Sequence, residues 1–201
     1  MDIKLIIDEE ELKKPCVDIV TVEEAKDIAK LLKEGIMLFD GVGLAANQIG
    51  INKKMAIIIG NNQEYIYLIN PQVVSAENEF IVEKEGCLSF PKKYFKTKRF
   101  EHYVIKNNII DGDRFREETQ YYYSDIEKVN KNDRHRVDLQ GICAQHEIDH
   151  INNKVITEYG ILDYEIVDNS IIKNKIGRND PCPCGKKDLN GRVMKYKKCC
   201  Y

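Results

Sequence analysis

The chain has 201 residues, of which 43% are hydrophobic and 32% charged, a mixture typical of a soluble globular protein with one sizeable core. No apolar run approaches the roughly 18 residues of a membrane-spanning helix. Because the acidic N-terminal stretch also lacks the basic-then-apolar layout of a signal peptide, we expect a cytoplasmic protein with no membrane partner.

The first predicted element is a helix near residues 22–39. Thr21 and Glu24 have the spacing of a capping box, and apolar residues recur at helical spacing as far as Phe39. The glycine-rich stretch 41–50 follows and does not fit an ordinary element. Strands are then expected at 55–59, 65–70, 73–74, 79–83, 102–106 and 115–123, with a turn at 111–113.

The last predicted helix covers about 138–151, with Asp138 as its possible N-cap. Residues 152–177 are polar, and we expect a short helix or strand there before a linker. Because the strands come first and this helix comes late, the order of elements favours an α+β fold with mostly antiparallel sheets.

The main chemical signal is QHEIDH at 145–150. On a helix, His146 and His150 project from one face and can hold one metal ion. Glu147 lies beside the first of them, where its carboxylate can move a proton of a metal-activated water. The alternative is a helix with two unrelated histidines. Apolar residues around this face argue against it, because buried histidines need polar partners.

A catalytic metal site usually has a third protein ligand and one open position. EGCLSF at 85–90 offers Cys87, which follows a glycine that allows close approach of the backbone. A free cysteine is more often a small buried hydrophobe. Cys143, on the apolar face of the histidine helix, suits that role better. Cys87 is therefore the candidate third ligand.

Three segments in this order resemble the peptide deformylase family: GVGLAANQ at 41–48, EGCLS at 85–89 and QHEIDH at 145–150. The likeness covers about residues 10–163. It implies sheets around a central metal-binding helix. It also implies a metal-dependent amidohydrolase, in which a metal hydroxide removes the N-formyl group from the initiator methionine of nascent polypeptides and releases formate.

The resemblance implies a role for each matching residue. Cys87, His146 and His150 would hold the metal, usually Fe²⁺, with Ni²⁺ or Zn²⁺ able to substitute. Glu147 would act as general base and then as acid. An oxyanion hole would be formed by the Gln48 side-chain amide and the Leu88 N–H.

The positions that match substrate contacts are Val42, Gly43, Gly86, Ile142 and Cys143. The two glycines would let a substrate backbone lie close in a strand-like pairing, and the other three would line the pocket for the methionine side chain. Tyr94 stands where many members have an arginine that contacts the substrate backbone, so preference beyond methionine is expected to differ. Asn47 stands where many have proline, and Arg99 matches a family arginine whose role the sequence does not indicate.

The C-terminal residues 177–201 carry four more cysteines: Cys182, Cys184, Cys199 and Cys200. This segment resembles the SEC-C motif, a small zinc-binding tail of the protein-translocation ATPase and other proteins, with a longer middle. Since it has few apolar side chains, order would require a structural Zn²⁺. The alternative is a disordered basic tail with incidental cysteines. We expect a catalytic domain over 1–165, a linker over 166–176 and the zinc motif over 177–201.

Charge is distributed unevenly along the chain. Residues 171–201 contain nine basic and two acidic residues, so this segment carries +7 while the chain as a whole carries −2. A basic tail on an acidic body suggests an anionic partner. We expect docking on the ribosome, through its RNA or through a ribosomal or chaperone protein.

Two other functions are open on the sequence alone. A zinc peptidase of the His-Glu-x-x-His type would need a downstream third ligand, for which Glu158 and Glu165 are the options, and it would leave the Gln48 segment without a role. An inactive binding module is disfavoured by the complete set of matched site residues. An assay that compares deformylation of formyl-Met peptides with hydrolysis of internal peptide bonds distinguishes these functions.

Overall fold

The computed structural model describes residues 3–125, 139–167, 170–173, 179, 181–182, 187–188 and 191–198. The main helices are α1 (Glu9–Leu12), α2 (Val22–Leu38), α4 (Leu139–Ile151) and α5 (Ile156–Tyr159), with short 3₁₀ turns η1 (Ala46–Ile49) and η3 (Tyr196–Lys198). In these parts of the chain, no helix is both long enough and apolar enough to cross a membrane.

Helix α2 confirms the first predicted element. The Thr21 side chain accepts a hydrogen bond from the Glu24 backbone N–H at 3.2 Å. The Glu24 carboxylate reaches one residue further back than a capping box requires and accepts from the Val20 N–H at 3.1 Å. The buried face of the helix is the predicted apolar stripe, with Leu32 and Ile36 among its most buried members.

A small antiparallel sheet has the order β1-β2-β3, with β1 (Gly43–Ala45), β2 (Met55–Ile59) and β3 (Tyr65–Ile69). Alternate residues of β2 point to opposite faces. Met55 and Ile57 pack with α2, whereas Ala56 and Ile58 pack with α4. Both faces of this sheet are therefore covered, and the glycine-rich stretch contributes its edge strand.

The larger antiparallel sheet has the order β4-β5-β7-β8, and β6 also pairs with β5. Its strands are β4 (Gln72–Gly86), β5 (Lys93–Asp111), β6 (Arg114–Tyr123), β7 (Ile161–Val167) and β8 (Ser170–Lys173). The pieces expected at 73–74 and 79–83 are one strand. The expected turn at 111–113 is confirmed, with Gly112 at φ +64° between paired Asp111 and Arg114.

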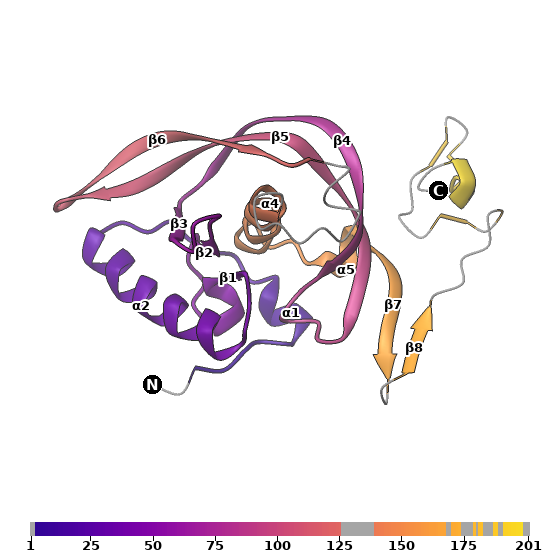
Figure 1. The fold of residues 1–201 in the computed structure, drawn as a ribbon, viewed down its shortest axis with the longest axis horizontal. Coiled ribbons are helices and arrows are strands. Elements are labelled where there is room, and N and C mark those ends of the chain that lie inside the picture. Colours follow the sequence, from indigo (N-terminus) through magenta and orange to yellow (C-terminus); the bar gives the residue numbers. More distant parts are fainter. Residues whose placement is uncertain are drawn as a thin grey trace.

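Helix α4 runs between the two sheets, seen nearly end-on in Figure 1. Its apolar residues Ala144, Ile148 and Ile151 pack against both sheets. The predicted N-cap Asp138 lies outside the described residues. The expected α+β fold with antiparallel sheets around this helix is confirmed. The segment 166–176, expected to be a linker, contains the end of β7 and all of β8.

Candidate metal centre

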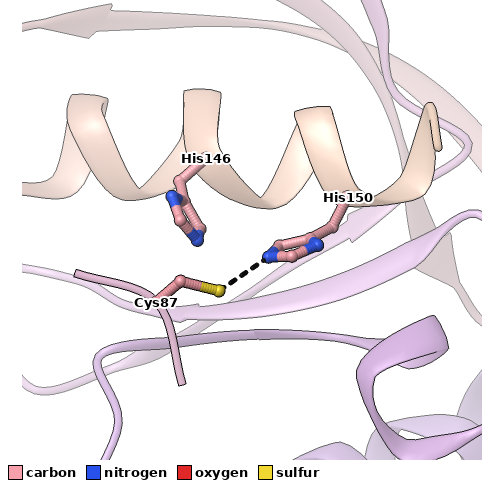
Figure 2. Close-up of side chains that lie close together, drawn as sticks. All are labelled: Cys87, His146 and His150. Atoms are coloured by element: carbon pink, nitrogen blue, oxygen red, sulfur yellow. Dashed lines mark hydrogen bonds between the residues drawn. The ribbon is translucent and has the colours of Figure 1, made fainter. Parts of the chain in front are cut away.

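Cys87, His146 and His150 meet at one point in the interior (Figure 2). One ligand atom from each lies within 4.8 Å of the others, and all three side chains are buried. The Cys87 sulfur is 3.2 Å from Nε2 of His150. Spacing of four residues on α4 places both imidazoles on one face, and Cys87 follows directly after β4. The predicted convergence is confirmed.

The donor set fits a metal ion. Glu85 accepts a hydrogen bond from Nδ1 of His146 at 2.7 Å, which leaves Nε2 of that ring for the metal. Burial and the neighbouring His146 hold the pKa of His150 well below its usual value, so its ring is in the neutral form that binds metals. One thiol and two imidazoles are typical ligands of a catalytic site with an open position.

A buried charge cluster supports His146 from behind. Arg99, 4% exposed, binds the Glu85 carboxylate with two nitrogens, one of them at 2.8 Å. It also donates to Asp149 at 2.6 Å and to the Tyr159 hydroxyl at 2.8 Å. Burial opposes ionisation of Glu85, but Arg99 and His146 outweigh it and hold the pKa of this carboxyl well below its usual value. This cluster gives Arg99 the role that its sequence position left open.

Glu147 lies beside the ligands without belonging to the cluster of three. Its side chain is buried, and Oε2 has no hydrogen-bond partner among the described residues. Burial raises the pKa of Glu147 to about 7, so the group can gain or lose a proton near neutral pH. The backbone of Gly43 lies so close to this carboxylate that an added Cβ would collide with it.

The Gln48 side chain is fixed in the interior by both ends of its amide. Oε1 accepts from the Ala45 N–H at 2.9 Å, while Nε2 lies 3.1 Å from the Ser89 hydroxyl and 3.6 Å from the Cys87 sulfur. These contacts bring the early glycine-rich segment, the EGCLS segment and α4 to one site. The amide N–H groups of Gln48 therefore face the metal-ligand side of the interior.

A cavity of about 500 Å³ opens at this site. Gln48, Leu88, His146 and Glu147 line it. The predicted substrate-contacting residues also line it, namely Val42, Gly43, Gly86, Ile142 and Cys143. Val42 is exposed at 45%, whereas Ile142 is buried, so the cavity runs from a solvent-facing mouth to an apolar interior. Burial raises the pKa of Cys143 well above its usual value, which keeps this thiol neutral and apolar in character.

Sequence reasoning missed the residues that position the ligands. Glu85 belongs to the same motif as Cys87, but nothing in its spacing indicated that it would bind His146. Ser89, Asp149 and Tyr159 were also not singled out. Their partners lie from 41 to 60 positions away along the chain, so only the folded structure brings them together.

Asn47 has a structural role that its sequence position did not reveal. Its side-chain amide donates to the backbone carbonyls of Leu12 at 3.0 Å and His150 at 2.9 Å. It thereby ties the N-terminal segment to the end of the metal-binding helix.

We expect Asn47→Leu to lower the free energy of unfolding by about 1–3 kcal/mol, because the Leu12 carbonyl loses the Asn47 donor and the His150 carbonyl keeps only the Asn153 N–H. Urea unfolding measures this. Exposed Asn61→Leu is the control and should change stability by less than about 0.5 kcal/mol. An Asn47 variant as stable as the parent would show that these bonds contribute nothing.

Of the four tail cysteines, Cys182 lies within the described residues and is buried, at 2% exposure. Its backbone N–H donates to the Met194 carbonyl at 2.7 Å, and Pro181 forms an antiparallel bridge with Lys195. Residues 181 and 182 thus lie against residues 194 and 195. Cys184, Cys199 and Cys200 lie outside the described residues.

Comparisons with known proteins agree with this site. The polypeptide deformylase family model matches residues 3–161. Peptide deformylase of Endomicrobium trichonymphae is 36% identical over 142 residues, which are 68% of this chain and 72% of that protein. Peptide deformylase 1 of Bacillus anthracis is 32% identical over 155 residues, covering 74% of this chain and 85% of that one.

Among solved structures, a peptide deformylase from Legionella pneumophila superposes with a TM-score of 0.63 at 29% identity. The alignment covers 79% of this chain and 84% of that one. The matched region contains all three metal ligands, Glu147 and Gln48. Family match, fold and metal centre agree, and the chain belongs to the peptide deformylase family of metal-dependent amidohydrolases.

Proposed function

We propose that this protein removes the formyl group from the initiator methionine of nascent polypeptides in the cytoplasm, releasing formate. The observation that carries the proposal is the meeting of Cys87, His146 and His150 at a cavity that also contains Glu147 and Gln48. A divalent metal ion held by the three ligands, with Fe²⁺ as the proposed physiological metal and Ni²⁺ or Zn²⁺ as substitutes, would supply Lewis acidity that activates water.

In this proposal Glu147 moves the protons. Its carboxylate takes a proton from the attacking water and then gives it to the departing amine of methionine. A pKa of about 7, raised by burial, suits a group that must serve first as base and then as acid near neutral pH. Its free oxygen Oε2 leaves the carboxylate able to reach the reacting atoms.

Gln48 and Leu88 are proposed to stabilise the negative charge that grows on the formyl oxygen. The Gln48 amide is held by Ala45 and Ser89 with its nitrogen toward the Cys87 side of the site, so little reorganisation is needed. Leu88 follows Cys87 directly, and its backbone N–H is the proposed second donor. Loss of one such donor typically costs about 3–4 kcal/mol of transition-state stabilisation.

The methionine side chain is proposed to enter the apolar part of the cavity beside Val42, Ile142 and Cys143. Gly43 and Gly86 would lie along the substrate backbone, where the absence of a side chain permits close approach. This arrangement would place the formyl group between Glu147 and the Gln48 amide.

We expect Gly43→Ala to lower kcat by about 10- to 100-fold, because the added methyl group must push the Glu147 carboxylate aside. Steady-state deformylation kinetics measure this. Gly112→Ala is the control: its φ of +64° means that alanine there strains the turn and lowers stability, but no atom lies within 4 Å of the added Cβ, so kcat should stay at the wild-type value. Unchanged kcat in the Gly43 variant would mean that this carboxylate need not be held in place.

The proposed function is tested by formate release from formyl-Met-Ala-Ser with protein purified anaerobically. A deformylase releases formate and leaves internal peptide bonds intact. Cleavage of internal bonds without formate release would support a zinc peptidase instead. Bound metal with neither activity would support an inactive binding module.

We propose that residues 177–201 form a separate zinc-binding motif after a catalytic domain, with Cys182, Cys184, Cys199 and Cys200 as ligands. The buried Cys182 and its bond to the Met194 backbone support this, because they bring the first cysteine near the end of the motif. The four cysteines offer the thiolate set of a closed structural zinc site.

We expect protein expressed with zinc and iron to contain two metal ions per chain, and Cys182→Ser/Cys184→Ser to contain one. The reason is that a four-thiolate site loses half its ligands while the catalytic site keeps all of its own. Elemental analysis by mass spectrometry measures this, with Cys16→Ser as the control outside both sites. An unchanged metal content in the double variant would contradict the motif.

The basic tail is proposed to dock on the ribosome, through RNA or through a protein. RNA docking would be strongly weakened by salt, because it depends on neutralised phosphates. Co-sedimentation with ribosomes compares the full chain with a truncation after residue 173, where β8 ends. Equal sedimentation of the two proteins would rule out docking by the tail.

A further inference from the structure

The mouth of the catalytic cavity is basic. Among the residues that the structure describes, three lysines line it, Lys84, Lys92 and Lys93, and the exposed acid that lines it with them is Asp40. The other two carboxylates of the lining belong to the buried interior. One is neutralised by a buried arginine, and the other is the proposed proton carrier. A bound peptide leaving the cavity would therefore pass an excess of positive charge.

Among the described residues, none of these lysines forms an ion pair, although Lys93 lies opposite Glu165 across β5 and β7 and is close enough to Glu9 to help Lys13 lower the pKa of that carboxyl. A shift in register between Val82 and Glu85 leaves both Glu83 and Lys84 exposed. Glu83, the neighbour of Lys84 in the sequence, forms an ion pair with Lys96 at 2.6 Å. No carboxylate of the described residues forms an ion pair with Lys84, Lys92 or Lys93.

Tyr94 lines the same cavity and stacks on Tyr164. The rings of Tyr94 and Tyr164 are stacked, with centroids 4.7 Å apart and planes 18° apart. The Lys84 ammonium lies 6.0 Å from the Tyr164 centroid. The Tyr94 ring also faces Gly86, where an added Cβ would lie 3.4 Å from it. Tyr94 therefore gives the cavity an aromatic surface, and the cation of Lys84 lies near the ring that stacks on it.

The spacing matches the residues that follow methionine in a substrate. Lys84 precedes the metal ligand Cys87 by three residues, so the two lie at most about 10 Å apart along the chain, because the strand is irregular between Val82 and Glu85 and ends at Gly86. An extended peptide also advances about 3.4 Å per residue. If the formyl group lies at the metal centre, the second and third residues of the peptide reach the level of Lys84, and Lys92 lines the same cavity.

We propose that this cavity mouth makes the enzyme selective for formyl-Met peptides with aspartate or glutamate at the second or third position. The inference rests on the proposed deformylase function and names its preferred substrate class. Lys84 and Lys92, with Lys93 beside them, attract the substrate carboxylate. Tyr94 confines the peptide to the strip beside Gly86, which keeps the acidic side chain within reach of the lysines.

The test compares kcat/KM for formyl-Met-Ala-Ser, formyl-Met-Asp-Ser, formyl-Met-Ala-Asp and formyl-Met-Lys-Ser. We expect one or both acidic peptides to be preferred over the neutral peptide by about threefold to tenfold at low salt, and the lysine peptide to be the poorest. The preference should shrink toward unity at about 0.5 M salt, because exposed charges are screened. Equal rates for acidic and neutral peptides would overturn the proposal.

Variants of the cavity lysines test whether these residues cause the preference for acidic peptides. In Lys84→Gln/Lys92→Gln the ratio of acidic to neutral kcat/KM should fall below about twofold. The control Lys4→Gln/Lys26→Gln removes the same charge from exposed positions outside the cavity and should keep the wild-type ratio. If the cavity variant does not fold, the salt dependence of the wild-type ratio still decides.

Further outcomes distinguish this proposal from the proposed deformylase function and from docking on the ribosome. No hydrolysis of any formyl peptide would overturn the proposed function together with this inference, whereas hydrolysis without charge preference overturns the inference alone. The proposal would also be overturned if Lys84→Gln/Lys92→Gln kept the wild-type substrate preference but no longer co-sedimented with ribosomes. The two lysines would then bind RNA phosphates and not the substrate.

Discussion

Glu147→Ala is expected to lower kcat for deformylation by about 10³-fold while leaving the metal content unchanged. A missing general base and acid typically costs about 10²- to 10⁴-fold. The lower end of that range is not expected here, because the buried site gives other groups little chance to replace the carboxylate. Formate release and elemental analysis on the same preparation measure both quantities.

The control for this variant is Glu34→Ala, which removes an exposed acid from α2 and should keep wild-type kinetics. Glu147→Asp should retain part of the activity, since it shortens the side chain but keeps the carboxylate. Turnover close to wild type in Glu147→Ala would remove this residue from the mechanism. Loss of metal in the same variant would instead give it a role in binding.

Arg99→Leu is expected to lower the free energy of unfolding by about 3–5 kcal/mol. The change leaves Glu85 charged and buried without its main counter-charge, which is the costly way to break a buried ion pair. It also removes donors from Asp149 and Tyr159. Urea or thermal unfolding of the metal-loaded protein measures the loss, and Arg114→Leu, 81% exposed at its side chain, is the control.

The same cluster predicts a dependence of stability on pH. The folded pKa of Glu85 lies below its ordinary value of 4.5 because of Arg99 and His146, so the cluster stabilises the fold fully above that value. Its contribution is lost progressively as the pH falls toward the folded pKa. The gap in stability between wild type and Arg99→Leu should therefore narrow between about pH 5 and pH 3. If the difference in stability does not change with pH, Arg99→Leu destabilises the protein through lost packing alone.

The two long helices were predicted well because each has a strong local signal, whereas the four-residue helix α1 was not predicted. Thr21 and an apolar stripe mark α2, and the two histidines lie four residues apart on α4. The long strands were predicted only in pieces. Strand β4 contains Glu77, Asn78 and Glu79, polar residues that break the apolar pattern but are tolerated on an exposed edge that pairs with β5.

The metal ligands and Glu147 were predictable because their chemistry restricts both residue type and spacing. Their supporting residues were not. Arg99 is one of many charged residues in the sequence, and only the fold shows that it is buried between Glu85 and Asp149. Asn47 is a similar case, since its two acceptors lie 35 and 103 positions away.

The most direct test is an iron K-edge X-ray absorption measurement on protein loaded anaerobically with one Fe²⁺ per catalytic site. The spectrum is expected to show one sulfur about 2.3 Å from the iron together with two imidazole nitrogens, and Cys87→Ser is expected to lose the sulfur neighbour. An iron site without sulfur, or one whose sulfur persists in Cys87→Ser, would contradict it.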